Sequence, residues 1–117
     1  MNHTTIGNNG EELACNYLIN KGHKIIRRNF HFGRYGEIDI ISEFNNTLIF
    51  IEVKYRKSLS YGSPVCAISA AKQKSLRKSA EGYLYVNQIT DKDCRFDLIA
   101  IDASSGTPKI EHIENAM

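Results

Sequence analysis

Apolar and polar residues alternate along two neighbouring stretches of the chain, 37–43 and 47–55. Successive side chains of a strand point to opposite faces, so this alternation predicts two β-strands. Asn45 and Asn46 lie between them and tolerate the positive φ angles of a tight hairpin turn. The pattern therefore predicts an antiparallel hairpin. A two-residue turn sets the register that pairs Asp39 with Glu52 and Glu37 with Lys54.

Two helical patterns and three further strands complete the expected order of elements. Asn8 or Asn9 can cap a helix that runs to about Lys21, and Ser69 can cap a second helix that reaches about Val86. Apolar runs predict strands over 24–30, 95–101 and 109–113, and a loop rich in Ser and Gly covers 56–68. The order α-β-β-β-α-β-β predicts an α/β fold with a mixed sheet flanked by helices.

Length and composition narrow the class of protein. The 117 residues suffice for one domain, expected to span 1–117. We expect a cytoplasmic protein that does not enter the membrane, because the chain has no long apolar run and no signal-peptide pattern at its start. The histidines are scattered without ligand spacing and are expected at the surface. The cysteines, Cys15, Cys66 and Cys94, are expected to be structural and buried.

Charged residues interrupt the apolar strands of the hairpin. In the predicted register Asp39 faces Glu52, and Lys54 shares the sheet face of Glu52. Directly opposed residues have Cβ atoms about 4.5–5.5 Å apart, and two carboxylates that close repel unless a cation lies between them. Mg²⁺ suits such a pair, since it is usually held by one or two carboxylates together with waters and a substrate phosphate. Lys54 could then orient or deprotonate a water, or neutralise charge on a phosphate.

The two helices offer further polar residues at the edges of their apolar stripes. Helical spacing turns Glu11 toward the sheet. On the second helix, Gln73 points inward and Lys72 lies at the margin of the stripe. Both could approach the acids, or they could satisfy buried backbone groups. Glu37 is expected to pair with Lys54 or an arginine, and Asp97 to accept hydrogen bonds inside its strand.

Together these residues resemble a known nuclease pattern. An acid on the first helix, then Asp, then Glu-x-Lys on the next strand is similar to the PD-(D/E)xK superfamily, which includes type II restriction enzymes and archaeal Holliday junction resolvases. More closely, the sequence resembles the YraN-like family of uncharacterised small bacterial endonuclease-like proteins. The matching segments run from Gly7 to Ile101 and include Gly10-Glu11, Arg28-Asn29, Gly36-Glu37-Ile38-Asp39, Phe50-Ile51-Glu52-Val53-Lys54-x-Arg56 and Arg95-Phe96-Asp97. Ile38 stands where the superfamily motif has a proline.

The resemblance implies a restriction endonuclease-like core, α-β-β-β-α-β, with the strand at 109–113 as a short C-terminal addition. It implies catalytic roles for Asp39, Glu52, Lys54 and Glu11, with Gln73 as a further candidate from the helix pattern. It also implies that Asp39, Glu52, Glu11 and the backbone carbonyl of Val53 hold Mg²⁺ or Mn²⁺. Resemblance to junction resolvases implies branched or recombination-linked DNA as the partner, and a homodimer that would match a two-fold substrate.

Basic and aromatic residues surround the predicted site. Arginines contact phosphates and aromatic rings can stack on bases, so these residues are candidates for nucleic-acid binding. The candidates are Arg27, Arg28, Arg34, Tyr35, Arg56, Lys57 and Lys72. A second basic stripe, Lys74, Arg77 and Lys78, lies on the outer side of the second helix and is predicted to be a solvated face.

Three functions follow from these patterns, and the sequence leaves them open. The first is a metal-dependent nuclease that hydrolyses DNA phosphodiester bonds. The second is a catalytically inactive nucleic-acid-binding module on the same fold, and the third is a protein-interaction adaptor whose acids only pair with arginines. A solvated, salt-bridged sheet face is the simpler interpretation of the acids. We expect a covered face instead, because Leu48 and Phe50 share it.

Overall fold

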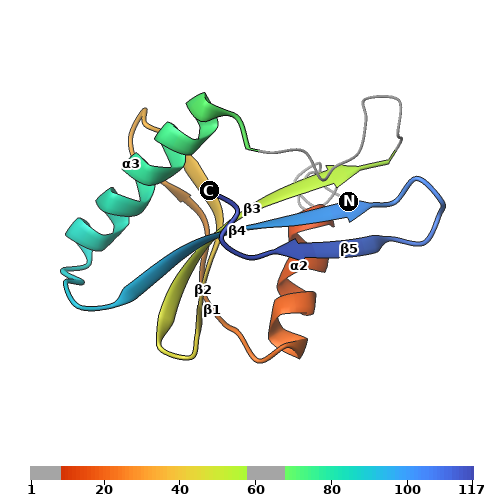
Figure 1. Cartoon of the computed structure of the whole chain (residues 1–117), viewed down its shortest axis with the longest axis horizontal. Coiled ribbons are helices and arrows are strands. Elements are labelled where there is room, and N and C mark those ends of the chain that lie inside the picture. Colours follow the sequence, from red (N-terminus) through yellow and green to blue (C-terminus); the bar gives the residue numbers. More distant parts are fainter. Residues whose placement is uncertain (1–8, 58–67) are drawn as a thin grey trace, which may run out of the picture.

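A mixed β-sheet carries the fold (Figure 1). The computed structural model describes residues 9–57 and 68–117. Within them the five strands lie side by side in chain order: β1 (Lys24–His31), β2 (Glu37–Phe44), β3 (Thr47–Arg56), β4 (Asp93–Asp102) and β5 (Lys109–Ile113). The β3–β4 pair is parallel and the other pairs are antiparallel. Helices α2 (Asn9–Asn20) and α3 (Ala70–Val86) pack on opposite faces of this sheet.

The observed order confirms the predicted α/β fold, a mixed sheet flanked by two helices as in a restriction endonuclease-like core. The Ser69 side chain caps α3 as expected, accepting a hydrogen bond from the Lys72 N–H at 3.2 Å. The β4 strand is longer than its apolar run, because all ten of its residues pair with β3. Most of the loop predicted over 56–68, with Cys66, lies outside the described residues. No helix in the described part of the chain is long and apolar enough to cross a membrane.

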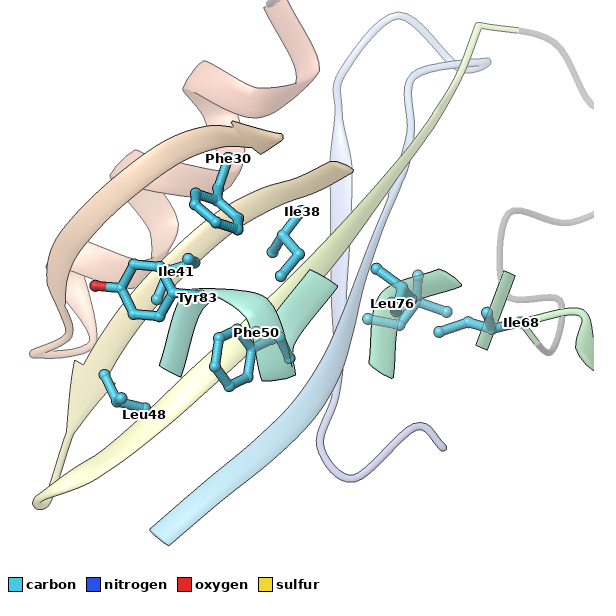
Figure 2. Packing of buried hydrophobic residues seen from close by; sticks show 10 residues of the cluster. Phe30, Ile38, Ile41, Leu48, Phe50, Ile68, Leu76 and Tyr83 are labelled. Atoms are coloured by element: carbon cyan, nitrogen blue, oxygen red, sulfur yellow. The ribbon is translucent and has the colours of Figure 1, made fainter. Parts of the chain in front are cut away.

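Each face of the sheet carries its own apolar core. On one face Leu76 and Tyr83 of α3 pack with Phe50 of β3, as Figure 2 shows. On the other face Leu18 of α2 packs with Ile51 of β3, among other buried side chains. Successive residues of β3 therefore serve opposite cores, which is the burial expected of a strand covered on both sides.

The alternation of β2 breaks at Asp39. The sequence pattern placed Ile38 and Ile40 on one face, and this prediction was wrong. Ile38 belongs to the core under α3, whereas Ile40 belongs to the core under α2. At the same level in β1, between the residues paired with Ile40 and Ile38, Asn29 has a φ of 54°. This left-handed conformation, which Asn tolerates, turns the strand over between the neighbours of Asn29.

The reversal extends to both strands at the same level. Arg28 pairs with Ile40 and its side chain reaches the acids of α2. Phe30 pairs with Ile38, and both side chains join the core under α3 (Figure 2). Asp39 is therefore the residue of β2 at which the apolar side chains change from one face of the sheet to the other.

A buried polar network lies on the α2 face of the sheet. Asp97 is 1% exposed and accepts hydrogen bonds from Arg95, from the Asn115 amide at 3.1 Å, and from His112 at 2.7 Å. Asp97 thus accepts hydrogen bonds as expected. The surface prediction is wrong for His23, which is buried and bonded to Ser42 at 3.0 Å, and for His112, whose side chain is 3% exposed.

The cysteine prediction divides in the same way. Cys15 is buried at 5% exposure in the core under α2, as expected. Cys94 is exposed, although burial was predicted, because it is the second residue of β4, where the strand is still exposed to solvent.

Asp97→Asn is expected to lower the free energy of unfolding by about 3–5 kcal/mol at pH 7, because it leaves the Arg95 charge without its buried partner. Burial raises the pKa of Asp97, but the hydrogen bonds from His112 and Arg95 outweigh it and hold the pKa below its ordinary value. A depressed native pKa means that the contribution is present above about pH 4 and lost as the pH falls further. Urea unfolding of both proteins across this range measures it.

Glu111→Gln removes an exposed carboxylate from β5 and serves as the control. It is expected to leave the urea midpoint unchanged. An Asp97→Asn protein as stable as wild type at pH 7 would contradict a structural role for the network.

Candidate active site

The strands β2 and β3 pair next to their turn and then part. The predicted register is confirmed from Phe44 and Thr47 as far as Ile40 and Ile51. Beyond that point β2 remains paired with β1, and β3 remains paired with β4 (Figure 1). The ladder pairs predicted further along, Asp39 with Glu52 and Glu37 with Lys54, are therefore not formed. We call this parting of the strands the fork.

At the fork, a side chain rather than the backbone accepts a hydrogen bond from β3. The Val53 N–H donates to Oδ2 of Asp39 at 2.8 Å. In a regular ladder a main-chain carbonyl of β2 would accept this hydrogen bond. Here the Asp39 carboxylate accepts it instead and lies between the two strands. The same bond fixes the orientation of the Asp39 carboxylate, because a half-buried acid bonded to a strand amide has little freedom to rotate.

Glu52 and Asp39 form a carboxyl–carboxylate pair in this fork. Burial raises the pKa of Glu52 to about 7, together with the charge of Asp39 and a hydrogen bond that Glu52 donates to it. Burial also raises the pKa of Asp39, against the hydrogen bonds from the Val53 amide and Glu52. The two acids therefore share a proton near neutral pH, as closely placed carboxylates do.

Two lysines moderate the charge of this pair. Lys72, in the first turn of α3, places Nζ 3.6 Å from Oε2 of Glu52. Lys54 lies two residues beyond Glu52 on β3, and both lysines lower the pKa of Glu52 against the larger effect of burial. The Lys72 side chain is 41% exposed and that of Glu52 only 12%. Lys72 is thus the more exposed partner of this ion pair.

Glu11 reaches the same region from the first turn of α2. Burial and the charge of Asp39 raise its pKa, while a hydrogen bond from Asn29 and the charge of Arg28 lower it. Nη2 of Arg28 lies 3.9 Å from Oε1 of Glu11. The helix pattern was therefore right to turn Glu11 toward the sheet.

The donor set suits a hard divalent cation. Oε1 of Glu11 and Oε1 of Glu52 are buried without a hydrogen-bond partner. Oxygens of this kind, in acids whose pKa burial has raised, are stabilised by an added positive charge. In the described ranges, no three His, Cys, Asp or Glu side chains gather as a protein-only metal centre. One or two carboxylates suffice for Mg²⁺, so the Asp39–Glu52 pair fits this ion.

The remaining candidates divide by location. Gln73 donates to the Ile68 carbonyl at 2.9 Å and so satisfies the backbone in front of α3. Oε2 of Glu37 lies 3.4 Å from Nε2 of His31 on β1. Arg56, at the end of β3, has a buried Nε without a hydrogen-bond partner, and Lys57 beside it is exposed.

The basic residues of β1 and its turn lie apart from one another. Arg28 joins the α2 side of the fork through its bond to Glu12 at 3.0 Å. The Arg27 guanidinium lies 5.3 Å from the centre of the Phe30 ring. Arg34 and Tyr35 lie in the β1–β2 turn against α3. Sequence reasoning named Asn29 only within the matching segment Arg28-Asn29 and did not predict its left-handed conformation, in which Asn is enriched.

Relative to the wild type, Glu52→Gln is expected to raise the free energy of unfolding of the metal-free protein at pH 8 but not at pH 5. A native pKa of about 7, above the ordinary 4.5, means that the protonated form is the stable one. Its contribution is complete below about pH 4.5 and is lost as the pH rises through 7. At about 1.36 kcal/mol per pKa unit, the gain reaches at most about 3 kcal/mol. Urea unfolding with a chelator at both pH values measures it, with Glu111→Gln as the control. A variant with the same pH dependence as wild type would contradict the buried pair.

Comparisons with known proteins agree over most of the chain. The model of the "Uncharacterised protein family UPF0102" matches residues 10–101. A UPF0102 protein of Syntrophomonas wolfei is 44% identical over 107 residues, covering 92% of each chain. One of Shewanella sediminis is 44% identical over 110 residues, covering 94% of this chain and 89% of the relative. One of Natranaerobius thermophilus is 42% identical and covers 99% of both. These matches confirm the resemblance to YraN-like proteins, and the chain belongs to the UPF0102 family.

Proposed function

We propose that this protein is a metal-dependent nuclease that hydrolyses DNA phosphodiester bonds, with branched or recombination-linked DNA as its substrate class. The observation that carries the proposal is the buried Asp39–Glu52 pair at the fork, where Glu52 has a pKa of about 7 and Lys72 lies 3.6 Å from it. Carboxylates with raised pKa values beside specific charge partners are characteristic of functional sites. A solvated, salt-bridged sheet face would leave these acids at their ordinary pKa values.

The acids of the fork would hold the metal. Asp39 and Glu52, with the carbonyl of Val53, are the proposed ligands for Mg²⁺ or Mn²⁺, and Glu11 is proposed to assist them from α2. When bound, such an ion supplies charge stabilisation of the phosphate and lowers the pKa of a coordinated water. The bond from the Val53 amide keeps the Asp39 carboxylate in one orientation, so that it need not be ordered on binding.

The lysines act on the other side of the same pair. Lys54 is proposed to orient the attacking water or to take its proton. Lys72 is proposed to contact the scissile phosphate, which would replace Glu52 as the partner of its ammonium group. Arg28, Arg56 and Lys57 would hold the DNA backbone. Such contacts read the shape of DNA rather than its sequence.

The ion pair between Lys72 and Glu52 favours a second candidate. With this ammonium in place, part of the charge of the acids is neutralised by the protein itself. A nucleic-acid-binding module that does not cleave could therefore retain the fork without a metal. The adaptor hypothesis has its own support in the bonds of Arg28 to Glu11 and Glu12.

The purified protein is expected to cleave DNA with Mg²⁺ or Mn²⁺ and not with a chelator. A panel of linear, nicked, flapped and four-way DNA measures this, with four-way or flapped DNA cut fastest. Glu52→Ala and Lys54→Ala are each expected to lower the rate at least about a hundredfold, the usual contribution of a positioned acid–base group. Glu111→Gln and Lys109→Ala, two exposed residues of β5, are the matched controls.

The outcomes separate the three hypotheses. Cleavage by the Glu52→Ala and Lys54→Ala proteins at the wild-type rate would exclude this site. Salt-sensitive DNA binding without metal-dependent turnover would favour the binding module. Absence of both DNA binding and metal binding would favour the adaptor.

Mn²⁺ affinity is expected to rise about tenfold between pH 6 and pH 8. Ligands must lose their protons to bind a metal, and a Glu52 pKa of about 7 keeps this acid mostly protonated at pH 6 and mostly ionised at pH 8. Isothermal titration calorimetry at both pH values measures the change. Glu52→Gln is expected to bind more weakly and with little dependence on pH. A pH-independent affinity in the wild type would contradict Glu52 as a ligand.

A further inference from the structure

A second surface of functional character runs along the outer side of α3. One hollow of about 360 Å³ is lined by Phe32, Tyr35, Lys78, Glu81, Gly82 and Tyr85. A neighbouring hollow of about 270 Å³ is lined by Arg34, Tyr35, Ala71, Lys74, Ser75 and Lys78. Because Tyr35 and Lys78 line both, the two hollows form one continuous depression, which we call the α3 groove.

The turn between β1 and β2 is fastened to α3 to form this groove. Gly82 has no side chain, and a Cβ there would lie 2.5 Å from the ring of Phe32, so only glycine lets that ring rest on the helix. The Ser75 hydroxyl donates to the Tyr35 carbonyl. Gly36, with a φ of 141°, lies against the same serine, where a side chain would collide. The turn is therefore held by packing and hydrogen bonding at several residues.

Aromatic rings from the fastened turn and from α3 face solvent along the groove. The rings of Phe32 and Tyr35 stack with centroids 5.6 Å apart and planes at 26°. Tyr35 remains 51% exposed and Tyr85 is 83% exposed. Large rings held this far into water are available for stacking by a ligand, because they contribute little to the core.

Cations accompany these rings. Nζ of Lys78 lies 4.7 Å from the centre of the Tyr35 ring. Arg34 and Lys74 extend the positive charge along the groove, and Glu81 is the one acid among its lining residues. A groove that combines cations for a phosphate backbone with aromatic platforms for bases is the arrangement that binds single-stranded nucleic acid. An apolar partner would instead bury three cations with a single acid, Glu81, among the lining residues to offset them.

The groove begins beside the candidate active site. Its first lining residue on α3, Ala71, directly precedes Lys72, which contacts Glu52. Its last, Tyr85, lies fourteen residues further along the helix, about 20 Å at 1.5 Å per residue. A strand leaving the fork could therefore follow α3 along this groove.

We propose that the α3 groove binds single-stranded DNA, with bases on Tyr85 and Tyr35 and phosphates on Lys74, Lys78 and Arg34. This inference rests on the proposed nuclease function and sharpens its substrate class. The preferred DNA carries a single-stranded arm, as in a flap or fork, beside the bond that is cut. Of the stripe Lys74, Arg77 and Lys78, predicted to be a solvated face, Lys74 and Lys78 line the groove and are part of the proposed binding surface, whereas Arg77 is not among the lining residues.

Binding to a fluorescein-labelled oligothymidylate of about 12 nucleotides, within the usual site size, tests the groove by fluorescence anisotropy. A chelator is present throughout, so that cleavage plays no part. Tyr85→Ala is expected to weaken binding about 5- to 150-fold, the range for loss of one stacked base. Lys74→Ala and Lys78→Ala are each expected to reduce the salt slope by about 0.7. Lys109→Ala on β5 removes the same charge outside the groove and is expected to have little effect.

Several results would overturn the inference. Wild-type affinity in the Tyr85→Ala protein would do so, as would equal weakening by Lys109→Ala. Tighter binding of the matching oligouridylate would exclude DNA as the ligand. Tyr85 is exposed, so loss of folding does not confuse the result, and circular dichroism of each variant confirms this.

The groove and the nuclease can fail separately. Oligothymidylate binding that depends on Tyr85, in a protein that cleaves nothing, would keep the groove and exclude the nuclease. Metal-dependent cleavage with oligothymidylate binding unaffected by Tyr85→Ala would keep the nuclease and exclude the groove. If both hold, Tyr85→Ala slows cleavage of flapped DNA more than cleavage of linear duplex.

Discussion

The bond from the Val53 amide to the Asp39 carboxylate connects the fold with the site. A main-chain donor in the middle of a sheet must find an acceptor, and here a side chain provides it. The hairpin therefore ends as a ladder at Ile40 and Ile51, and the strands separate around two acids. Glu11 from one helix and Lys72 from the other approach these acids from opposite faces of the sheet. Without the fork, the helices would face a closed sheet.

The buried acids of the protein have pKa values shifted in opposite directions. Asp97 is surrounded by donors from Arg95, His112 and Asn115, and its pKa lies below the ordinary value. Asp39 and Glu52 are buried against each other, and their pKa values are raised. Full hydrogen bonding marks a structural acid, whereas unpaired oxygens and mutual repulsion reduce stability and leave binding capacity. This contrast within one sheet is the strongest physical reason to place function at the fork.

Helix α3 has a different role on each of its sides. Leu76 and Tyr83 build the core beneath it, and Lys72 in its first turn meets Glu52. Its outer side supports the β1–β2 turn at Gly82 and so shapes the α3 groove. Because these surfaces belong to one rigid element, a strand of DNA on the groove and a phosphate at the fork would keep a fixed relation. Positioning of this kind reduces the entropy lost when a substrate is oriented for reaction.

The sequence by itself determined the elements, the turn at Asn45 and Asn46, the register up to Ile40 and Ile51, and the family. These depend on local spacing and on turn residues, which a sequence displays directly. Only the tertiary structure decided the fork, the reversal of β1 at Asn29, the burial of His23 and the ion pair of Lys72 with Glu52. Strand alternation assumes an unbroken ladder, and it fails where a side chain replaces a backbone acceptor. Burial and ion pairing depend on residues distant in sequence, which come together only after both helices have packed on the sheet.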